Sequence, residues 1–318
     1  MKDFILDAAV TLRRNYQDLP FDAITNEETA RRVVDRAVST LQREGANFIY
    51  LRPADLHPEK REDLQLRRLL NTDPQSAPFC SAFLRADGSL CVETAGEDHL
   101  IISAYDEQGA LSRCLSSALI ISDALEDSGQ IARNEQFGCL TAFPSDAGSG
   151  LRATLTLHLP MTALRRQIPG ALKLSAQGGT TLRPLDSGLF RLENRITMGM
   201  DDNELVRLLA QTAEKLCNTE RELREAAKGK GDLLVLDAAW RAYGVAKSAR
   251  RLPRKEAMRL WSGLALGISM ENMPYQEENV DALYRIVTAP SENNSELAPL
   301  QRDALFADRV RALFDGGN

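Results

Sequence analysis

The sequence has few of the residues that bind metals or form disulfides. Three histidines are present among 318 residues, and the five cysteines are odd in number and form no C-x-x-C pair. The histidines are His57, His99 and His158, and the cysteines are Cys80, Cys91, Cys114, Cys139 and Cys217. This scarcity argues against a disulfide framework and against a structural zinc site. We expect reduced, mostly buried thiols and assign no metal ligand.

Long apolar runs and excess positive charge are also missing. No stretch approaches the length of a membrane-spanning helix, and the N-terminal residues Met1-Lys2-Asp3-Phe4 lack a signal-peptide layout. The 45 acidic residues outnumber the 39 Lys and Arg residues, for a net charge of −6. This balance argues against general nucleic-acid binding. We therefore expect a cytoplasmic protein that acts on neither nucleic acid nor membranes.

The remaining composition is that of a chain able to bury a core. Hydrophobic residues make up 43% and charged residues 26%, and 318 residues suffice for one large domain or two ordinary ones. Thr25 and Glu28 form a capping-box pattern ahead of an amphipathic helix at 27–44. Asp87-Gly88, a favoured hairpin dipeptide, joins two strand candidates within 79–93. Further strands are expected at 99–105, 136–142, 151–159 and 189–197, and further helices at 111–125 and 202–226.

The pattern changes at Lys228-Gly229-Lys230-Gly231, the best linker candidate. Before it, strands and helices are mixed without regular βαβ spacing, which favours an α+β fold with a largely antiparallel sheet. After it, only helices are expected, at 232–250, 253–268, 277–288 and 299–314. We therefore predict an α+β domain over 1–226 and an all-helical domain over 232–318.

Residues Phe137–Pro160 carry the most informative motif. A Gly148-Ser149-Gly150 turn is followed by Arg152 and by a strand in which apolar and polar residues alternate. This frame resembles the active-site segment of the ATP:guanido phosphotransferases, the phosphagen kinase superfamily that includes the bacterial protein arginine kinases. The resemblance implies a phosphagen-kinase-like catalytic domain, with helices flanking an antiparallel sheet, and the use of ATP with Mg²⁺. The family's reactive cysteine, which directly precedes the proline, is here Phe143.

Two N-terminal segments carry the same resemblance, with losses. Leu6–Phe21 resembles the family stretch that opens S-x-R-x-R-L-x-R-N, and the two phosphate-binding arginines of that stretch fall on Ala9 and Thr11. The segment G-E-D-H-L-I, which ends at Ile101, resembles N-E-E-D-H-L-R. Glu97 matches the catalytic carboxylate of that motif, whereas Ile101 replaces a nucleotide-binding arginine.

A third loss lies downstream. Leu172–Gly178 resembles a strand that ends in arginine-glycine, with Gln177 at the arginine. Arg152 is then the one match among the family's five phosphate-binding arginines. Phosphoryl transfer depends on positioning and on neutralising phosphate charge, and the replacing side chains supply neither charge nor a bidentate fork. We therefore expect ordinary ATP-dependent turnover to be lost and nucleotide binding to be weakened.

Each matched residue also has a structural interpretation. Glu97, the candidate for a vestigial base, either still acts as a catalytic base or is a solvated carboxylate. Arg152 is either a phosphate contact or an exposed arginine at the start of a strand. The turn through Gly148 and Gly150 is either a phosphate cradle or a plain tight turn. His99 is interpreted as a structural histidine of the sheet.

The C-terminal part resembles the bacterial protein arginine kinase branch. Residues 239–250 contain R-x-Y-G and K-x-A-R at matching spacing, and Arg302-Asp303 resembles the start of the branch's phosphoarginine-receptor helix, with Phe306 at the next arginine. In that branch this domain pairs subunits. The resemblance implies a homodimer or a heterodimer with an active paralogue, and it adds a zinc-finger activator or a Clp-type chaperone as partners. The apolar residues predicted to exceed the needs of the domain's own core are Leu260, Trp261, Leu264 and Leu266.

Two hypotheses from different classes follow. The first is a catalytically impaired protein-arginine-kinase homologue that acts as a regulatory or binding subunit and uses no cofactor. The alternative is an active ATP-dependent protein arginine kinase with a rebuilt phosphate-binding site, whose charge comes from Arg13, Arg67, Arg68 or Lys173. Convergence of three or more of these residues on a cleft near Glu97 would favour the enzyme, and their dispersal would favour the binding subunit.

Overall fold

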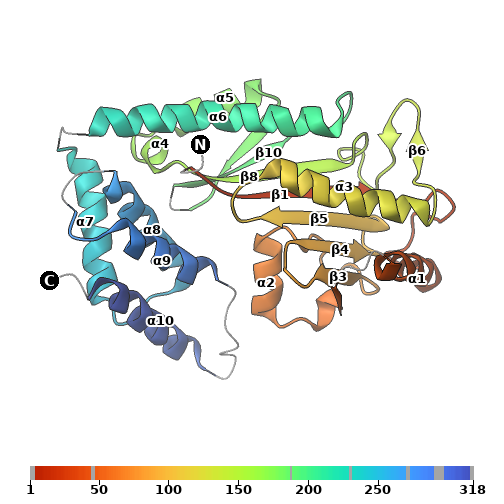
Figure 1. Ribbon diagram of the computed structural model, residues 1–318, viewed down its shortest axis with the longest axis horizontal. Helices are drawn as coiled ribbons and strands as arrows, with labels where there is room; N and C mark the ends of the chain where they lie inside the picture. The colour runs from red at the N-terminus through yellow and green to blue at the C-terminus, as the bar shows by residue number, and fades with distance from the viewer. Residues whose placement is uncertain are drawn as a thin grey trace. The chain divides into compact units, whose positions relative to one another are not determined.

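Strand β1 (Ile5–Arg14) lies inside an eight-stranded sheet, between β5 (Leu100–Asp106) and β8 (Leu151–His158), and pairs antiparallel with both. From β5 an antiparallel meander leads to one edge of the sheet through β4 (Leu90–Thr94), β3 (Ser81–Arg85) and β2 (Phe48–Leu51). Beyond β8, the sheet continues with β10 (Leu189–Asn194) and β9 (Thr180–Pro184). This sheet, flanked by helices, confirms the predicted α+β fold (Figure 1).

The computed structural model describes residues 4–43, 47–186, 188–228, 231–269, 273–289 and 297–315. The chain divides into two compact units. The first consists of Met1–Leu157, Leu174–Leu182 and Arg191–Ala213, and the second of His158–Lys173, Arg183–Phe190 and Glu214–Asn318. The predicted linker at 228–231 lies partly outside the described residues, and the predicted domain boundaries stay a prediction. None of the helices within the described ranges is long and apolar enough to cross a membrane.

In the first unit, helices cover one face of the sheet. Helix α3 (Leu111–Asp127) packs against β1 and β5, and α1 (Glu27–Arg43) contacts α3 and β4. Because successive strand residues point to opposite faces, one set of alternate β1 residues supplies the buried surface under α3. Helix α1 begins where predicted, but its N-terminal cap is Asn26, not Thr25. The Asn26 Oδ1 atom accepts a hydrogen bond from the Glu28 amide at 3.1 Å.

The other face of the sheet is partly covered by α2 (Pro58–Leu66) and the residues after it. The short helix η1 (Pro53–Asp55) precedes α2 in the chain. Leu64 and Leu69 form one buried cluster with Ala82, Leu84 and Cys91 of the sheet. Strands β6 (Arg133–Asn134) and β7 (Gly138–Cys139) form a separate small hairpin. The strand expected at 136–142 is therefore reduced to two residues.

In the second unit, helices α7 (Leu233–Ser248), α8 (Arg254–Ile268), α9 (Glu277–Thr288) and α10 (Pro299–Phe314) confirm the four predicted helices. Helix α8 packs against α7, α9 and α4 (Pro160–Leu164). Met161, Ala227, Val235 and Leu266 form a buried cluster of this unit. Helix α6 (Asp202–Ala227) begins in the first unit and ends in the second.

The α8 residues predicted to exceed the needs of the domain's core belong to that core. Leu260, Trp261, Leu264 and Leu266 are all buried. The Trp261 ring lies 4.5 Å from the His158 ring and 4.7 Å from the Tyr284 ring, centroid to centroid. The prediction that these four side chains exceed the needs of the domain's own core is therefore wrong, because α8 packs against α7, α9 and α4.

Candidate active site

The predicted phosphate-binding positions gather on the face of the sheet that is turned away from α3. Thr11 lies opposite Ser103 of β5 and opposite Arg152 of β8, and Arg13 lies opposite Ile101. Strand alternation places Ala9, Thr11 and Arg13 on the same face. The pairing of three strands therefore brings together four of the positions identified from sequence motifs, Ala9, Thr11, Ile101 and Arg152.

Three of these positions are closed to solvent. Ala9 is 3% exposed, Thr11 6% and Ile101 1%. The Thr11 and Ser103 hydroxyl oxygens are 3.1 Å apart, and the Asn71 side chain, from the segment after α2, donates to Ser103 at 2.9 Å. The side chains of Thr11, Ser103 and Asn71 are thus hydrogen-bonded to one another, and an added anion finds no unpaired donor at Thr11.

Glu93 is a buried carboxylate on the same face that sequence reasoning missed. It lies opposite Ile101 in the pairing of β4 with β5 and is fully buried. The backbone amides of Asn71 and Thr72 donate to its two carboxylate oxygens at 2.7 and 2.9 Å. Burial raises the pKa of Glu93, and these hydrogen bonds act in the opposite direction. A glutamate directly after three apolar strand residues was the available signal, and its role is to fix the covering segment to the sheet.

Five charged side chains form a cluster at the end of this face, which we call the Arg13 cluster: Arg13, Glu97, Asp98, Asp146 and Arg152. Arg13 Nη1 lies 3.1 Å from Asp98 and 3.7 Å from Glu97, and Arg13 Nε lies 3.3 Å from Asp146. Asp146 also accepts a hydrogen bond from Arg152. Two guanidinium groups therefore face three carboxylates, and the cluster carries an excess of negative charge.

Asp98 and His99 have structural roles beside the cluster. Asp98 accepts hydrogen bonds from the Asn15 side chain at 2.6 Å and from the Ala142 amide at 2.7 Å. The Tyr16 amide donates to His99 Nδ1 at 3.0 Å, so Nε2 carries the proton and donates to the Pro20 carbonyl at 2.7 Å. Burial lowers the pKa of His99. The interpretation of His99 as a neutral, structural histidine agrees with these contacts.

The backbone conformation of the Gly148-Ser149-Gly150 turn explains why it contains two glycines. Gly148 and Gly150 have φ angles of 106° and 66°, which favour glycine. A Cβ atom on Gly148 would lie 2.3 Å from the Thr197 carbonyl oxygen. The Gly148 and Ser149 amides donate to the carbonyls of Cys139 and Thr197 at 3.1 and 2.8 Å. These two donors are thus engaged within the chain, which favours a plain tight turn.

The arginines that the alternative hypothesis would use to bind phosphate have different partners in the structure. Arg13 contacts Glu97, but Arg67 pairs with Asp63 at 3.3 Å. Arg68 lies 3.8 Å from Glu193 on β10. Lys173 is an exposed residue of α5 (Ile168–Gln177). Of the three arginines proposed to rebuild the site, only Arg13 contacts Glu97.

The strand expected at 172–178 is wrong. Residues up to Gln177 form helix α5, and the strand that follows is β9, which reads Thr180-Thr181-Leu182-Arg183-Pro184. Two adjacent threonines and a leucine favour a strand, whereas 172–178 contains no β-branched residue. The assignment of Gln177 to a strand-terminal arginine therefore loses its basis, and Arg183 is the arginine near the end of a strand.

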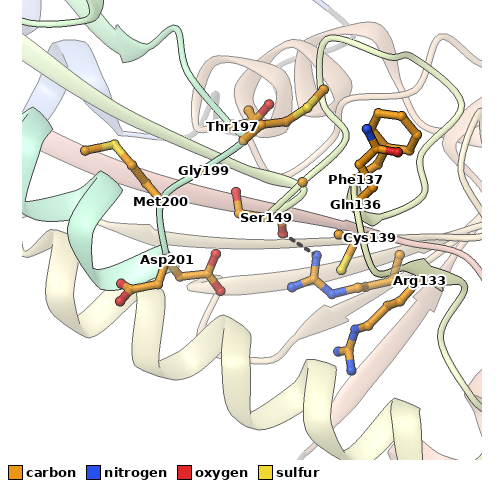
Figure 2. Close-up of a pocket in the computed structure, with 14 residues that line it drawn as sticks. Arg133, Gln136, Phe137, Cys139, Ser149, Thr197, Gly199, Met200 and Asp201 are labelled. Atoms are coloured by element: carbon orange, nitrogen blue, oxygen red, sulfur yellow. Dashed lines mark hydrogen bonds between the residues drawn. The ribbon is translucent and has the colours of Figure 1, made fainter.

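A pocket lies on the opposite side of β1 from the Arg13 cluster. Its volume is about 450 Å³, and its lining includes Arg14, the β6–β7 hairpin, the turn at Gly148 and Ser149, and residues 197–202. Figure 2 shows Arg133 and Asp201 on opposite sides of this pocket, with Ser149 between them. Phe137, Gly148 and Ser149 of its lining belong to the Phe137–Pro160 motif, but the sequence did not show that residues 197–202 complete a pocket with them.

Arg302 and Asp303, the residues that resemble a phosphoarginine-receptor motif, both lie on α10. The Asp303 carboxylate accepts a hydrogen bond from Arg251 Nε at 2.9 Å, and its carbonyl accepts one from the Leu252 amide at 3.0 Å. Asp303 therefore ties α10 to the segment that joins α7 and α8. Within the described ranges, no group of three or more histidine, cysteine or acidic residues is arranged to hold a metal ion.

Comparison with protein families gives two matches in chain order. Residues 29–223 match the model of the ATP:guanido phosphotransferase C-terminal catalytic domain. Residues 232–316 match the model of the protein-arginine kinase McsB C-terminal domain.

Similar proteins are found over nearly the whole chain. A protein-arginine kinase of Desulforamulus reducens is 30% identical over 97% of this chain and 91% of its own length. One from Moorella thermoacetica is 29% identical, covering 99% of this chain and 95% of the relative. One from Bacillus subtilis is 26% identical, covering 99% and 92%.

Solved structures show the same fold. The crystal structure of lombricine kinase matches with a TM-score of 0.61 at 18% identity, covering 74% of this chain and 70% of that chain. The substrate-free duplicated taurocyamine kinase from Schistosoma mansoni matches with a TM-score of 0.59 at 20% identity. The match covers 69% of this chain and 32% of that duplicated protein.

Proposed function

The chain belongs to the ATP:guanido phosphotransferase family, and from this premise we propose that it is a cytoplasmic regulatory or binding subunit of the protein-arginine-kinase type that does not itself phosphorylate arginine. The observation that carries the proposal is the Arg13 cluster. Arg152, the one matching phosphate-binding arginine, is bonded to Asp146, and Glu97, the matching carboxylate, is paired with Arg13.

The residues present do not fit the triphosphate of ATP with its Mg²⁺. Phosphoryl transfer needs cations around the phosphates, and each lost contact of this kind costs on the order of a hundred-fold or more in rate. Ala9, Thr11 and Ile101 provide no cation and are buried. The three carboxylates of the Arg13 cluster would repel a polyanion. These features favour loss of turnover and weak nucleotide binding.

The alternative is an active protein arginine kinase with a rebuilt site. It requires at least three shifted cations near Glu97. Arg67 and Arg68 are instead paired with Asp63 and Glu193, so their charges are already compensated. The dispersal of these arginines favours the regulatory subunit over the enzyme.

The test combines two measurements on the full chain. Mg²⁺-ATP is titrated into the protein by calorimetry, and phosphoarginine formation on a generic protein substrate is measured with an active family member as the positive control. We expect no phosphoarginine above background and weak or absent ATP binding. Turnover by the unmodified chain that Glu97→Gln abolishes would overturn the proposal.

Asp146→Asn sharpens the test, because it removes the carboxylate that holds Arg152 and contacts Arg13. We expect this variant to bind ATP more tightly than the unmodified chain, severalfold at least, since a cation regained beside a phosphate strengthens binding. It should still show no turnover. Asp55→Asn, at a carboxylate exposed on η1, is the matched control and should leave ATP binding unchanged.

The helical C-terminal unit is proposed to dock partners through α7. The apolar side chains exposed on that helix are Leu233, Leu234, Trp240 and Val245. Large apolar groups gathered on one helix favour an interaction surface. We propose a second copy of the chain, or an active relative, as the partner. A zinc-finger activator, a Clp-type chaperone and a phosphoarginine site at Arg302 and Asp303 stay predictions from the family resemblance.

A further inference from the structure

The pocket in Figure 2 is separate from the Arg13 cluster, because strand β1 stands between them. Arg13 points to the cluster, and the next residue, Arg14, lines the pocket. The pocket volume of about 450 Å³ falls within the range usual for small-molecule sites, roughly 300–1,000 Å³. The question is which ligand chemistry its charged groups would recognise.

Arg14 is a buried cation without a carboxylate partner. It is 4% exposed, and its guanidinium donates to the carbonyls of Arg13 and Ser149, each at 2.9 Å, and to the Ser122 hydroxyl at 3.2 Å. No acidic residue in the described part of the chain forms an ion pair with it. A buried charge whose hydrogen bonds all go to neutral groups is costly, so this cation favours a hydrogen-bonding anionic group in the pocket.

Asp202 is the opposite charge on the same pocket. It is half-buried, and burial raises the pKa of its carboxyl group, while Arg14 and Arg133 act in the other direction. Neither arginine forms an ion pair with Asp202 among the described residues, and Arg133 is instead bonded to Glu126 at 2.8 Å. Asp202 therefore favours a cationic group in the pocket.

Asp201 has a structural task that sets it apart from Asp202. Its carboxylate accepts from the Glu204 amide at 2.7 Å, and the Glu204 carboxylate accepts from the Asp201 amide at 2.9 Å. This is a reciprocal cap on helix α6. The carboxylate left for a ligand is that of Asp202.

The pocket lining also includes exposed apolar side chains. Phe137 is 47% exposed and Met198 is 44% exposed, and both line the pocket. Met200 adds a third apolar side chain, and Figure 2 shows it on the side opposite Phe137. Such a lining suits an aliphatic stem, which gains from leaving water.

We propose that this pocket binds a free basic α-amino acid of the arginine or lysine class. Its carboxylate would face Arg14, its side-chain cation would face Asp202, and its methylene stem would lie along Met198 and Phe137. A simple anion would leave Asp202 unpaired beside it, and a simple cation would leave Arg14 unpaired. The zwitterion satisfies both groups at once. This inference is independent of whether the Arg13 cluster supports catalysis.

The experiment is calorimetric titration of the full chain with L-arginine and L-lysine, with agmatine and acetate as the separate cationic and anionic arms. We expect saturable binding of at least one amino acid and binding of agmatine that is roughly tenfold or more weaker, since one charged hydrogen-bonding group is missing. Asp202→Asn should weaken amino-acid binding by a similar factor, and Asp202→Glu should restore part of it.

Asp35→Asn is the matched control, at an exposed carboxylate on α1, and it should change nothing. Glu97→Gln separates this pocket from the vestigial substrate position, and it should also leave amino-acid binding unchanged. Loss of binding in Glu97→Gln with full binding in Asp202→Asn would overturn the proposal. Equal binding of agmatine and L-arginine, or no saturable binding of either amino acid at millimolar concentration, would overturn it as well.

Discussion

His158 is the residue whose surroundings predict a pH effect most directly. Its side chain is buried in the second unit, with Nε2 2.8 Å from the Ser262 hydroxyl and the ring beside Trp261. Burial, together with the smaller effect of the nearby Arg224 charge, lowers the pKa of His158 to about 3. In the unfolded chain a histidine has a pKa of about 6.5. Between these two pKa values, His158 is protonated in the unfolded state and neutral in the folded state.

The sign of the effect follows from that difference. The stability contributed by neutral His158 is fully present above about pH 6.5 and is lost as the pH falls toward 3, by about 1.4 kcal/mol for each pKa unit. We expect His158→Gln to weaken the slope of stability against pH in this window. Urea unfolding at a series of pH values measures it. His57→Gln, at an exposed histidine, should keep the wild-type slope, and an unchanged slope in His158→Gln would contradict the argument.

Single residues of the candidate site were partly predictable. The motifs located Glu97 and Arg152, and strand pairing then explains why Arg152 lies beside Thr11. The sequence could not reveal that Asp146 bonds Arg152, because that contact depends on how the loop after Phe143 folds back. Arg13 was proposed as a cation that binds phosphate, but it forms ion pairs with Asp98 and Asp146 of its own chain.

At the scale of elements, helix α6 offers a test of local structure. Its first turn is held by the reciprocal cap between Asp201 and Glu204. Replacing an N-terminal capping residue with alanine costs about 0.5–2 kcal/mol. We expect Asp201→Ala to lower the free energy of unfolding by that amount, measured by urea denaturation. Asp237→Ala, which removes only an exposed pair with Arg241 on α7, should cost less, and an equal loss in both variants would argue against the cap.

Elements with strong periodicity were predicted well, and short ones were not. Helices α1, α3 and α6 and the hairpin at Asp87-Gly88 lie where the apolar spacing and the turn dipeptide placed them. Helices α2 and α4 were missed because they have nine and five residues, too few for a helical period to be recognised. A strand was predicted at 172–178 because the segment was matched to a motif, but its local propensity favours a helix, and the segment forms the end of α5.

At the scale of the whole molecule, the prediction concerns association. Leu233 of α7 is 77% exposed and Trp240 is 50% exposed, whereas the α8 residues first expected to meet a partner are buried. We expect the chain to pair through α7, burying roughly 800 Å² on each partner, the usual size of a specific interface. Sedimentation over a concentration series, alone and mixed with an active protein-arginine kinase, measures this association.

Trp240→Glu tests whether α7 is the surface involved. A charge placed in the apolar centre of an interface is costly to bury, so the variant should shift the equilibrium to monomer by roughly tenfold or more. Leu66→Glu is the matched control, because Leu66 is an exposed apolar residue at the end of α2 in the first unit. Association should persist in that control. A species that stays monomeric alone and in the mixture would contradict association through α7.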